Sequence, residues 1–238
     1  MAIAYDSGTY AANTTGTSLT FAFNNVAGDV IYVAGYNFAG TNTVTGVTYA
    51  GGALVQVANQ NGAAGRNDRA VDCWRRVAPA TGSNNVVVSS SSSTVMRYSA
   101  ISYSGVDQTT PENGTVLGDS GGSATSYSVA ITTTADNCWM ASISKDRNGN
   151  VTYTSTTGDT IRLNADVGGS MYMDTGNAIT PAGLNTMTVT MSSVNGIGGV
   201  AWAIRPVVTF PIKTWNGIPW ANIKTFNGIP VANIKTIS

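Results

Sequence analysis

The sequence predicts an all-β protein: a two-sheet antiparallel sandwich followed by a short β-hairpin repeat at the C-terminal end. Three observations predict this class. Apolar and polar residues alternate with period two along most of the chain, no stretch keeps the 3.6-residue period of a helix, and turn-forming dipeptides such as Asn-Gly separate the alternating segments. Many short strands at this spacing are typical of sandwiches, and both a jelly-roll-like and an immunoglobulin-like topology fit them.

The predicted strands follow one another from residue 19 to residue 207. Residues 29–38 (DVIYVAGYNF) are apolar almost throughout, which indicates a central, largely buried strand. Residues 44–58 fit two short strands around the Gly51-Gly52 turn, as in a tight hairpin. The other predicted strands lie at 19–23, 69–77, 85–90, 94–106, 126–132, 137–145, 151–155, 160–164, 170–175, 185–191 and 198–207.

The chain ends on a repeat, IKTWNGIPWANIKTFNGIPVANIKTIS (212–238), in which an 11-residue unit is written twice and begun a third time. The dipeptides Asn216-Gly217 and Asn227-Gly228 predict two hairpin turns one repeat apart. This change of pattern predicts two domains, a β-sandwich at 1–208 and a C-terminal assembly element at 209–238.

The predicted strands of the repeat carry apolar groups on both faces, and a small sheet cannot bury both alone. In one interpretation, one face packs on the sandwich and a loop covers the other. We favour a second, in which the repeat pairs with other copies of the chain or with another protein, because a nearly exact repeat suits a modular docking surface. The predicted interface residues are Trp215, Ile218, Trp220, Lys224, Phe226, Ile229 and Val231.

Charge is scarce and balanced. The chain has 12 basic and 12 acidic residues, and charged residues make up 10% of it. A neutral chain lacks the basic groove that follows a phosphate backbone and the field that attracts a protein to a membrane surface. No window approaches about 18 uninterrupted apolar residues, and the N-terminal stretch MAIAYDSGTYAANTTG lacks the pattern of a secretory signal. The sequence therefore predicts no nucleic-acid partner, no membrane partner and no cofactor.

The two cysteines, Cys73 and Cys138, are each followed by Trp and lie in apolar stretches. A disulfide between them is one interpretation. Two buried free thiols are the preferred one, because cysteine behaves as a small hydrophobic residue in protein cores.

No motif predicts catalysis. Residues 118–122 read GDSGG, the string around the nucleophile of chymotrypsin-like proteases, with Ser120 in the place of the nucleophile. That chemistry needs a histidine base, and the chain contains no histidine. We therefore interpret the string as a loop, and the lack of histidine also excludes His-based zinc sites.

Carboxylates give two further candidates, both of which we disfavour. Glu112 is the only glutamate, so a glycosidase pair would need aspartate, and acidic residues in predicted loops usually solvate the chain. The candidates for such a pair are Asp107, Glu112, Asp119, Asp159 and Asp166. DRNGN (146–150) is similar to the start of a calcium loop, but Val151 and Thr157 stand where that loop needs Gly and Glu. A hairpin turn explains DRNGN better, so the sequence predicts no catalytic residue and no metal site.

Aromatic and basic residues on the predicted strands give two structural expectations. Rings at strand spacing mostly belong to the core, although they could stack on sugars if they were exposed; they include Tyr5, Tyr10, Tyr36, Tyr49 and Trp74. Arg75 and Arg76 are adjacent on one strand, so one of them points inward or into an interface, where a carboxylate such as Asp72 is the expected partner.

Several segments together resemble a known kind of domain. In order they read SLTFAF, GDVIYVAGYNF, VTGVTYAGGALVQVA, AVDCWRRVAPATGSNNVVVSSS and YSAISYSGVDQTTP. This order is similar to a β-sandwich domain of phage virion structural proteins and bacterial surface proteins, with VTYAGGALVQV and ISYSGVDQTTP as its most telling parts. The resemblance covers roughly residues 10–207. The repeat resembles the NG-containing repeats that end some phage virion proteins.

The resemblance implies a non-enzymatic structural protein of a phage particle, such as a capsid decoration, collar, tail or fibre component, that assembles through its repeat. Its expected partners are other copies of itself and other virion proteins, and its expected location is the virion, after assembly in the host cytoplasm. The composition agrees with this location. A chain rich in Thr, Ser, Asn and Gly is typical of exposed surface proteins, and this chain shows no export signal, as expected for a virion protein assembled in the host cytoplasm. The alternative is a carbohydrate-binding or host-receptor-binding module with a host glycan as ligand, and an Asp-based glycan hydrolase is disfavoured.

Overall fold

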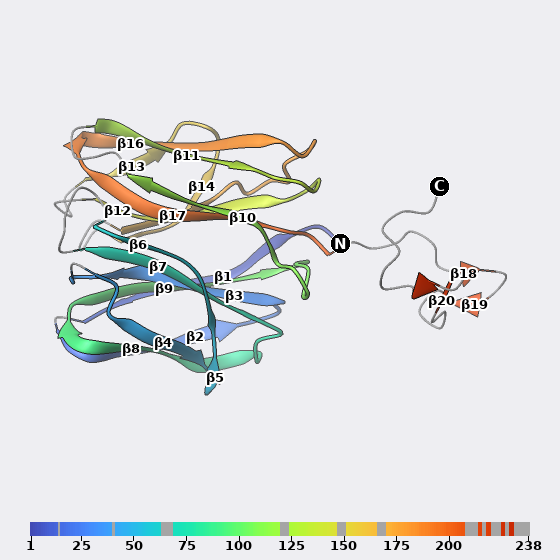
Figure 1. Cartoon of the computed structure of the whole chain (residues 1–238), viewed down its shortest axis with the longest axis horizontal. Helices are drawn as coiled ribbons and strands as arrows, with labels where there is room; N and C mark the ends of the chain where they lie inside the picture. Colours follow the sequence, from blue (N-terminus) through green and yellow to red (C-terminus); the bar gives the residue numbers. More distant parts are fainter. Residues whose placement is uncertain are drawn as a thin grey trace. The chain divides into compact units, whose positions relative to one another are not determined.

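The computed structural model describes residues 1–13, 15–39, 41–62, 69–119, 124–146, 151–165 and 170–207, together with four two-residue strands in the C-terminal repeat. The chain forms two compact units, Met1–Val207 and Val208–Ser238, and each is described by itself. Helix is absent from the described ranges, and the strands pair antiparallel (Figure 1). The predicted all-β class and the antiparallel sandwich are confirmed.

The first half of unit Met1–Val207 forms two sheets. Their strand orders are β1-β9-β3-β7-β6 and β2-β8-β4-β5, which we name inner sheet 1 and outer sheet 1. All eight residues of the central strand β3 are buried, as the apolar sequence at 29–38 predicts. The strands are β1 (Ala4–Ala12), β2 (Gly16–Asn25), β3 (Val30–Asn37), β4 (Val44–Tyr49), β5 (Gly52–Ala53), β6 (Val55–Asn61), β7 (Ala70–Val77), β8 (Gly82–Thr94) and β9 (Met96–Ser104).

The second half of the unit forms two more sheets. Their strand orders are β10-β17-β12-β15-β14 and β11-β16-β13, which we name inner sheet 2 and outer sheet 2. The strands are β10 (Glu112–Asp119), β11 (Ala124–Thr132), β12 (Trp139–Asp146), β13 (Tyr153–Ser155), β14 (Thr160–Ala165), β15 (Ser170–Asp174), β16 (Leu184–Asn195) and β17 (Ile197–Ile204).

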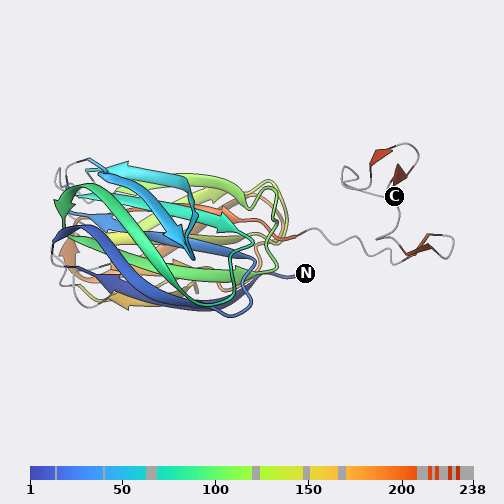
Figure 2. The same cartoon turned by 90° about the horizontal axis from the view of Figure 1, so that it is seen from below.

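The four sheets lie on one another as four layers, with the inner sheets in the middle (Figure 1). Figure 2 shows the strands running along the length of the unit. Three hydrophobic clusters fill the three gaps: one around Phe23 and Tyr98, one around Tyr32 and Trp202, and one rich in methionine around Met187. Each sandwich therefore has its own core, and the middle cluster joins the two sandwiches face to face.

The two halves have the same topology. Replacing β1, β9, β3, β7 and β6 by β10, β17, β12, β15 and β14 converts the strand order of inner sheet 1 into that of inner sheet 2. The outer sheets correspond in the same way, β2-β8-β4 to β11-β16-β13, and β5 is an addition to the first half. Unit Met1–Val207 is thus two copies of one eight-strand module.

Strand register and burial give residue-level equivalences between the modules. Val30 pairs with Tyr103, and Trp139 pairs with Ile204, at the same positions of the two inner sheets. The buried positions of β8 and β16 then coincide: they are Val86, Val88 and Ser90 in the first strand and Met187, Val189 and Met191 in the second.

A shared loop contact supports the equivalence. The register of β1 shifts between Tyr5 and Ser7, where the Asp6 carboxylate accepts a hydrogen bond from the Val26 amide at 3.1 Å. The register of β10 shifts at the same place in its sheet, where the Asn113 side-chain oxygen accepts one from the Thr134 amide at 2.6 Å. In both modules, an edge-strand bulge thus fixes the loop that leaves the second strand.

The structure departs from the sequence predictions at two edge strands. Neither β1 nor β10 was expected as a strand. Glu112, interpreted as a loop acid, begins β10, and Gly118 and Asp119 end it, so the start of the GDSGG string lies on a strand. Ser120 lies outside the described residues, as do 147–150 of the DRNGN segment. The hairpin predicted at DRNGN is wrong, because β12 pairs with β15 and β17, whereas β13 lies in another sheet and pairs with β16.

The second unit, Val208–Ser238, contains two short strand pairs. β18 (Thr214–Trp215) pairs with β19 (Ile218–Pro219), and β20 (Thr225–Phe226) pairs with β21 (Ile229–Pro230). The register is the same in both, because Trp215 pairs with Ile218 and Phe226 pairs with Ile229. The repeat in sequence is therefore a repeat in strand pairing.

Candidate functional site

A partly buried ion pair links the two modules. The Arg75 Nε atom on β7 lies 3.1 Å from Glu112 Oε1 on β10, and Tyr32 donates a hydrogen bond of 3.0 Å to the same oxygen. Burial raises the pKa of Glu112, while Arg75 and Tyr32 oppose that shift. The expectation that Asp72 would be the partner of this arginine pair is wrong, since the first arginine reaches across to the other module. Arg76 instead donates to the Tyr49 carbonyl oxygen at 2.6 Å.

A second polar cluster lies in the same middle layer, around Asp174. Its Oδ2 atom accepts hydrogen bonds from Tyr103 at 2.8 Å and from Arg162 Nε at 2.9 Å. The hydroxyls of Tyr103 and Tyr172 lie 3.0 Å apart, and burial raises the pKa of both phenols. The Asp174 side chain is fully buried, so these donors satisfy a carboxylate that would otherwise be costly to enclose.

Asp72 is a third buried carboxylate, and arginine does not neutralise it. Its side chain is 1% exposed, and Asn42 donates a hydrogen bond of 2.8 Å to Oδ2. Oδ1 has no hydrogen-bond partner among the described residues. Burial raises the pKa of Asp72 to about 6, although the neighbouring donors Tyr98, Trp74 and Asn42 act in the opposite direction.

Three of the acidic residues considered for a catalytic pair have separate structural partners. Asp107 accepts hydrogen bonds from the amides of Thr109 and Thr110 in its own turn. Asp159 accepts one from Thr157, and Glu112 belongs to the ion pair with Arg75. Asp119 ends β10, and Asp166 lies outside the described residues. Asp107, Asp159 and Glu112 therefore each have a separate structural partner.

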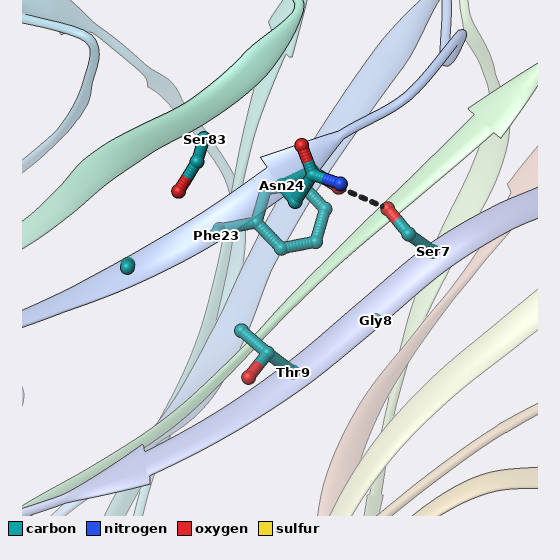
Figure 3. A pocket seen from close by; sticks show the side chains of 7 residues that line it. Ser7, Gly8, Thr9, Phe23, Asn24 and Ser83 are labelled. Atoms are coloured by element: carbon teal, nitrogen blue, oxygen red, sulfur yellow. Dashed lines mark hydrogen bonds between the residues drawn. The ribbon is translucent and has the colours of Figure 1, made fainter.

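A hollow lies between the edge strands of inner sheet 1 and outer sheet 1 (Figure 3). Its volume is about 320 Å³, and its floor includes Phe23, which is 2% exposed. The Ser7 hydroxyl in its wall donates to the Asn24 carbonyl oxygen at 2.7 Å. The lining residues are Ser7, Gly8, Thr9, Ala22, Phe23, Asn24 and Ser83. Hydroxyl and amide groups without a charged side chain suit a neutral, polar molecule.

Most aromatic residues singled out in the sequence belong to the core. Tyr36 and Tyr49 are fully buried, and Trp74 is 9% exposed. Tyr5 and Tyr10 on β1 are half-buried. The large hydrophobic side chains that are exposed in the described part of the chain are aliphatic, among them Val26 and Leu184. Stacking on a sugar through Tyr36, Tyr49 or Trp74 is thus precluded by their burial.

Both cysteines are buried free thiols, so the preferred interpretation of Cys73 and Cys138 is confirmed. Burial raises the pKa of the Cys73 thiol well above its ordinary value. A thiol that is protonated and enclosed is a poor nucleophile and a poor metal ligand, which indicates a packing role.

The distribution of charge was not foreseen from the sequence. Among the charged residues whose exposure the structure gives, Asp136 alone is exposed. The others are buried or half-buried, and Arg75, Glu112 and Asp174 make contacts between the two inner sheets. Alternating Ser and Thr on the outer strands, such as Ser126 and Ser128 on β11, leave the outer faces polar and uncharged. The composition shows that charged residues are few, but it does not show where in the fold they lie.

The predicted interface residues of the repeat divide into two groups. Trp215, Ile218, Phe226 and Ile229 lie on the paired strands β18 to β21. Trp220, Lys224 and Val231 lie outside the described residues. The strand pairs bring Trp215 opposite Ile218 and Phe226 opposite Ile229, so each pair joins two of the predicted residues.

The described ranges hold no group of three or more acidic, cysteine or histidine residues placed to bind a metal ion. Within the same ranges, no helix is long and apolar enough to cross a membrane. Comparison of the chain with protein-family models, with curated proteins and with solved structures gives no match.

Proposed function

We propose that the protein is a non-enzymatic structural component of a phage virion and that it assembles through its C-terminal repeat. The observation that carries the proposal is the separate compact unit Val208–Ser238, in which two strand pairs repeat with one register. A repeated pairing unit at the end of a self-contained sandwich suits the docking of one body to copies of itself or to neighbouring virion proteins.

The sandwich unit supports a structural role through the way it uses its reactive groups. Glu112, Asp174 and Arg75 hold two modules together in the middle layer. Cys73 is enclosed in the same layer. Carboxylate, guanidinium and thiol groups need access to a substrate in order to act chemically. Here these groups stabilise the fold and pack in its interior.

The repeat supports the assembly role through its composition. Its strand pairs include Trp215 and Phe226, and an aromatic side chain buries roughly 150–250 Å² when it is covered. Strands as short as β18 to β21 have little capacity to shield such surface themselves. A partner that covers aromatic side chains buries apolar surface, and this burial supplies association energy.

The test is a chain that ends at Val208, compared with the full chain. We expect the shortened chain to unfold in one cooperative transition at nearly the same denaturant concentration, because its cores are complete without the repeat. We also expect it to run as a monomer in gel filtration and to be missing from purified particles. Failure of the shortened chain to fold, or its normal incorporation into particles, would contradict the proposal.

A carbohydrate-binding module is the second candidate, favoured by the hollow between β1 and β2. The side chains of Thr9, Asn24 and Ser83 line it and have no hydrogen-bond partner in the described part of the chain. Binding on a glycan array that is lost in Asn24→Ala would support this candidate. Thr132→Ala is the matched control, because Asn24 and Thr132 hold the same position in the two modules.

A further inference from the structure

We infer that the inner face of each module is an association surface specific for the other module, and that two copies of the same module would not pair in this way. The inference goes beyond assembly through the repeat, because it concerns how unit Met1–Val207 is itself held together. It depends on the equivalence of the modules and on the charges that differ between equivalent positions.

The two modules meet around an approximate two-fold axis. β1 lies against β14 and β10 lies against β6, and exchange of the modules converts one contact into the other. The central strands also face each other, and Tyr36 and Lys145 are equivalent by register. The Lys145 ammonium lies 5.2 Å from the centre of the Tyr36 ring. Contact between equivalent residues places them at the axis, as in an isologous dimer.

Away from the axis, the two-fold symmetry generates two equivalent contact sites between the modules. The residues at these two sites differ. Arg75 is equivalent to Asp174, and Tyr5 is equivalent to Glu112. At one site Arg75 meets Glu112 at 3.1 Å. At the other site Arg162 connects the equivalent residues, because it binds Asp174 at 2.9 Å and its guanidinium lies 4.5 Å from the centre of the Tyr5 ring. Both sites are thus compensated in the mixed pair.

Pairing of like modules would leave a charge unmatched at each of the two sites. In a pair of first modules, Arg75 would face Tyr5 of the other copy and would lose its carboxylate. In a pair of second modules, Glu112 would approach Asp174 of the other copy, and Arg162 would be one cation for two carboxylates. Ala141 would also replace the hydroxyl donor Tyr32. An unpaired charge in a partly buried interface is unfavourable, and two carboxylates in proximity repel each other.

The residues at the axis, Tyr36 and Lys145, also favour the mixed pair over a pair of second modules, but more weakly. A pair of second modules would bring two copies of Lys145 together, whereas the mixed pair sets one lysine against an aromatic ring. Asp146 Oδ1 lies 3.8 Å from Lys145 Nζ and would reduce that repulsion. The carboxylates and guanidinium groups away from the axis are therefore the main source of specificity.

The link between the modules offers a place to separate them. It runs from Gly105 to Pro111, and the residues at its centre, Gln108, Thr109 and Thr110, are exposed. Most residues of the middle hydrophobic cluster lie on the strands, as do Arg75 and Glu112, and Val106 is the cluster's member in the link. A cut in the link should leave the middle hydrophobic cluster in place.

The experiment inserts a protease recognition sequence between Gln108 and Thr109 of the full chain and cleaves the folded protein. We expect the two fragments to stay together in gel filtration at a ratio of one to one. After the cut protein is unfolded and refolded, native mass spectrometry should find pairs of unlike fragments in place of like pairs. Separation of the cut fragments under native conditions, or refolding into like pairs, would overturn the inference.

Charge variants of the cut protein test the source of specificity. Glu112→Arg sets two cations against each other, so the dissociation constant of the fragments should rise at least about tenfold. The double variant Arg75→Glu, Glu112→Arg restores an opposite-charge pair and should recover most of the loss, which also guards against a single variant that simply misfolds. Asp136→Arg, an exposed site, is the control and should leave the dissociation constant unchanged. An unchanged constant in Glu112→Arg, or no recovery in the double variant, would contradict the assignment of specificity to this pair.

Discussion

Arg75 and Glu112 form an ion pair between two modules of the same topology, with 3.1 Å between Nε and Oε1. Neither residue has a like partner at the equivalent site, where Asp174 and Tyr5 stand. The pair is therefore a point at which two modules of the same topology differ chemically.

The first prediction concerns the energy of this pair. Arg75→Met or Glu112→Gln alone should lower the free energy of unfolding by about 2 kcal/mol, because each leaves the other group enclosed without its partner. The value is smaller than for a fully buried pair, since both side chains are nearly one-fifth exposed. The double variant should lose less free energy of unfolding than the two single variants lose in sum. Urea unfolding of all four proteins measures the coupling, and strict additivity would show that the pair has no mutual stabilisation.

The second prediction concerns the close approach of β3 and β9. A Cβ atom on Gly35 would lie 2.1 Å from the Arg97 carbonyl oxygen and 2.7 Å from the Tyr98 Cα atom. The backbone of a buried strand can move only at a large energetic cost. We therefore expect Gly35→Ala to lower the free energy of unfolding by at least about 3 kcal/mol.

Gly46→Ala is the matched control for that substitution. Gly46 also lies on a strand, β4, and a Cβ atom there would meet no atom within 4 Å. The free energy of unfolding should change by less than about 1 kcal/mol. Equal losses for Gly35→Ala and Gly46→Ala in denaturant unfolding would exclude close packing as the cause.

The strands that the sequence predicts well are those with one clear inward face. Val86 and Val88 on β8 alternate with more exposed residues, as Met187 and Val189 do on β16, and period-two alternation is visible without a structure. Strand β1 gives no such signal, because seven of its nine residues are half-buried. Strand β10 also lies at an edge and its register is irregular, so neither edge strand shows a regular alternation.

The doubling of the sandwich is hidden in the sequence because equivalent positions carry different residues. Tyr36 corresponds to Lys145, and Arg75 corresponds to Asp174. Topology and burial agree between the modules where the side chains differ, since a layer of the core needs apolar volume and not a particular residue. The interface of the repeat stays a prediction, because strand pairing places Trp215 opposite Ile218 but does not identify a partner.

The third prediction concerns the two thiols. Iodoacetamide should label neither Cys73 nor Cys138 in the folded protein, because both are buried and burial raises the pKa of each thiol. After unfolding without a reducing agent, mass spectrometry should find both cysteines alkylated. A peptide in which Cys73 and Cys138 are cross-linked would contradict the prediction, as would rapid labelling of either residue in the folded state.

The last prediction concerns Asp72 and the dependence of stability on pH. Burial raises the pKa of this carboxyl from 3.8 to about 6 in the folded protein. Between these values the folded state keeps a proton that the unfolded state has lost, so the stability that Asp72 contributes is present below about pH 4 and is lost as the pH rises to about 6. Asp72→Asn keeps an acceptor for Asn42 and cannot ionise. The free energy of unfolding of the variant should therefore gain about 3 kcal/mol relative to the wild type between pH 4 and pH 7. Urea unfolding of both proteins across this range gives the difference, and a difference that is flat or that changes in the opposite direction would show that the Asp72 carboxyl does not carry the raised pKa.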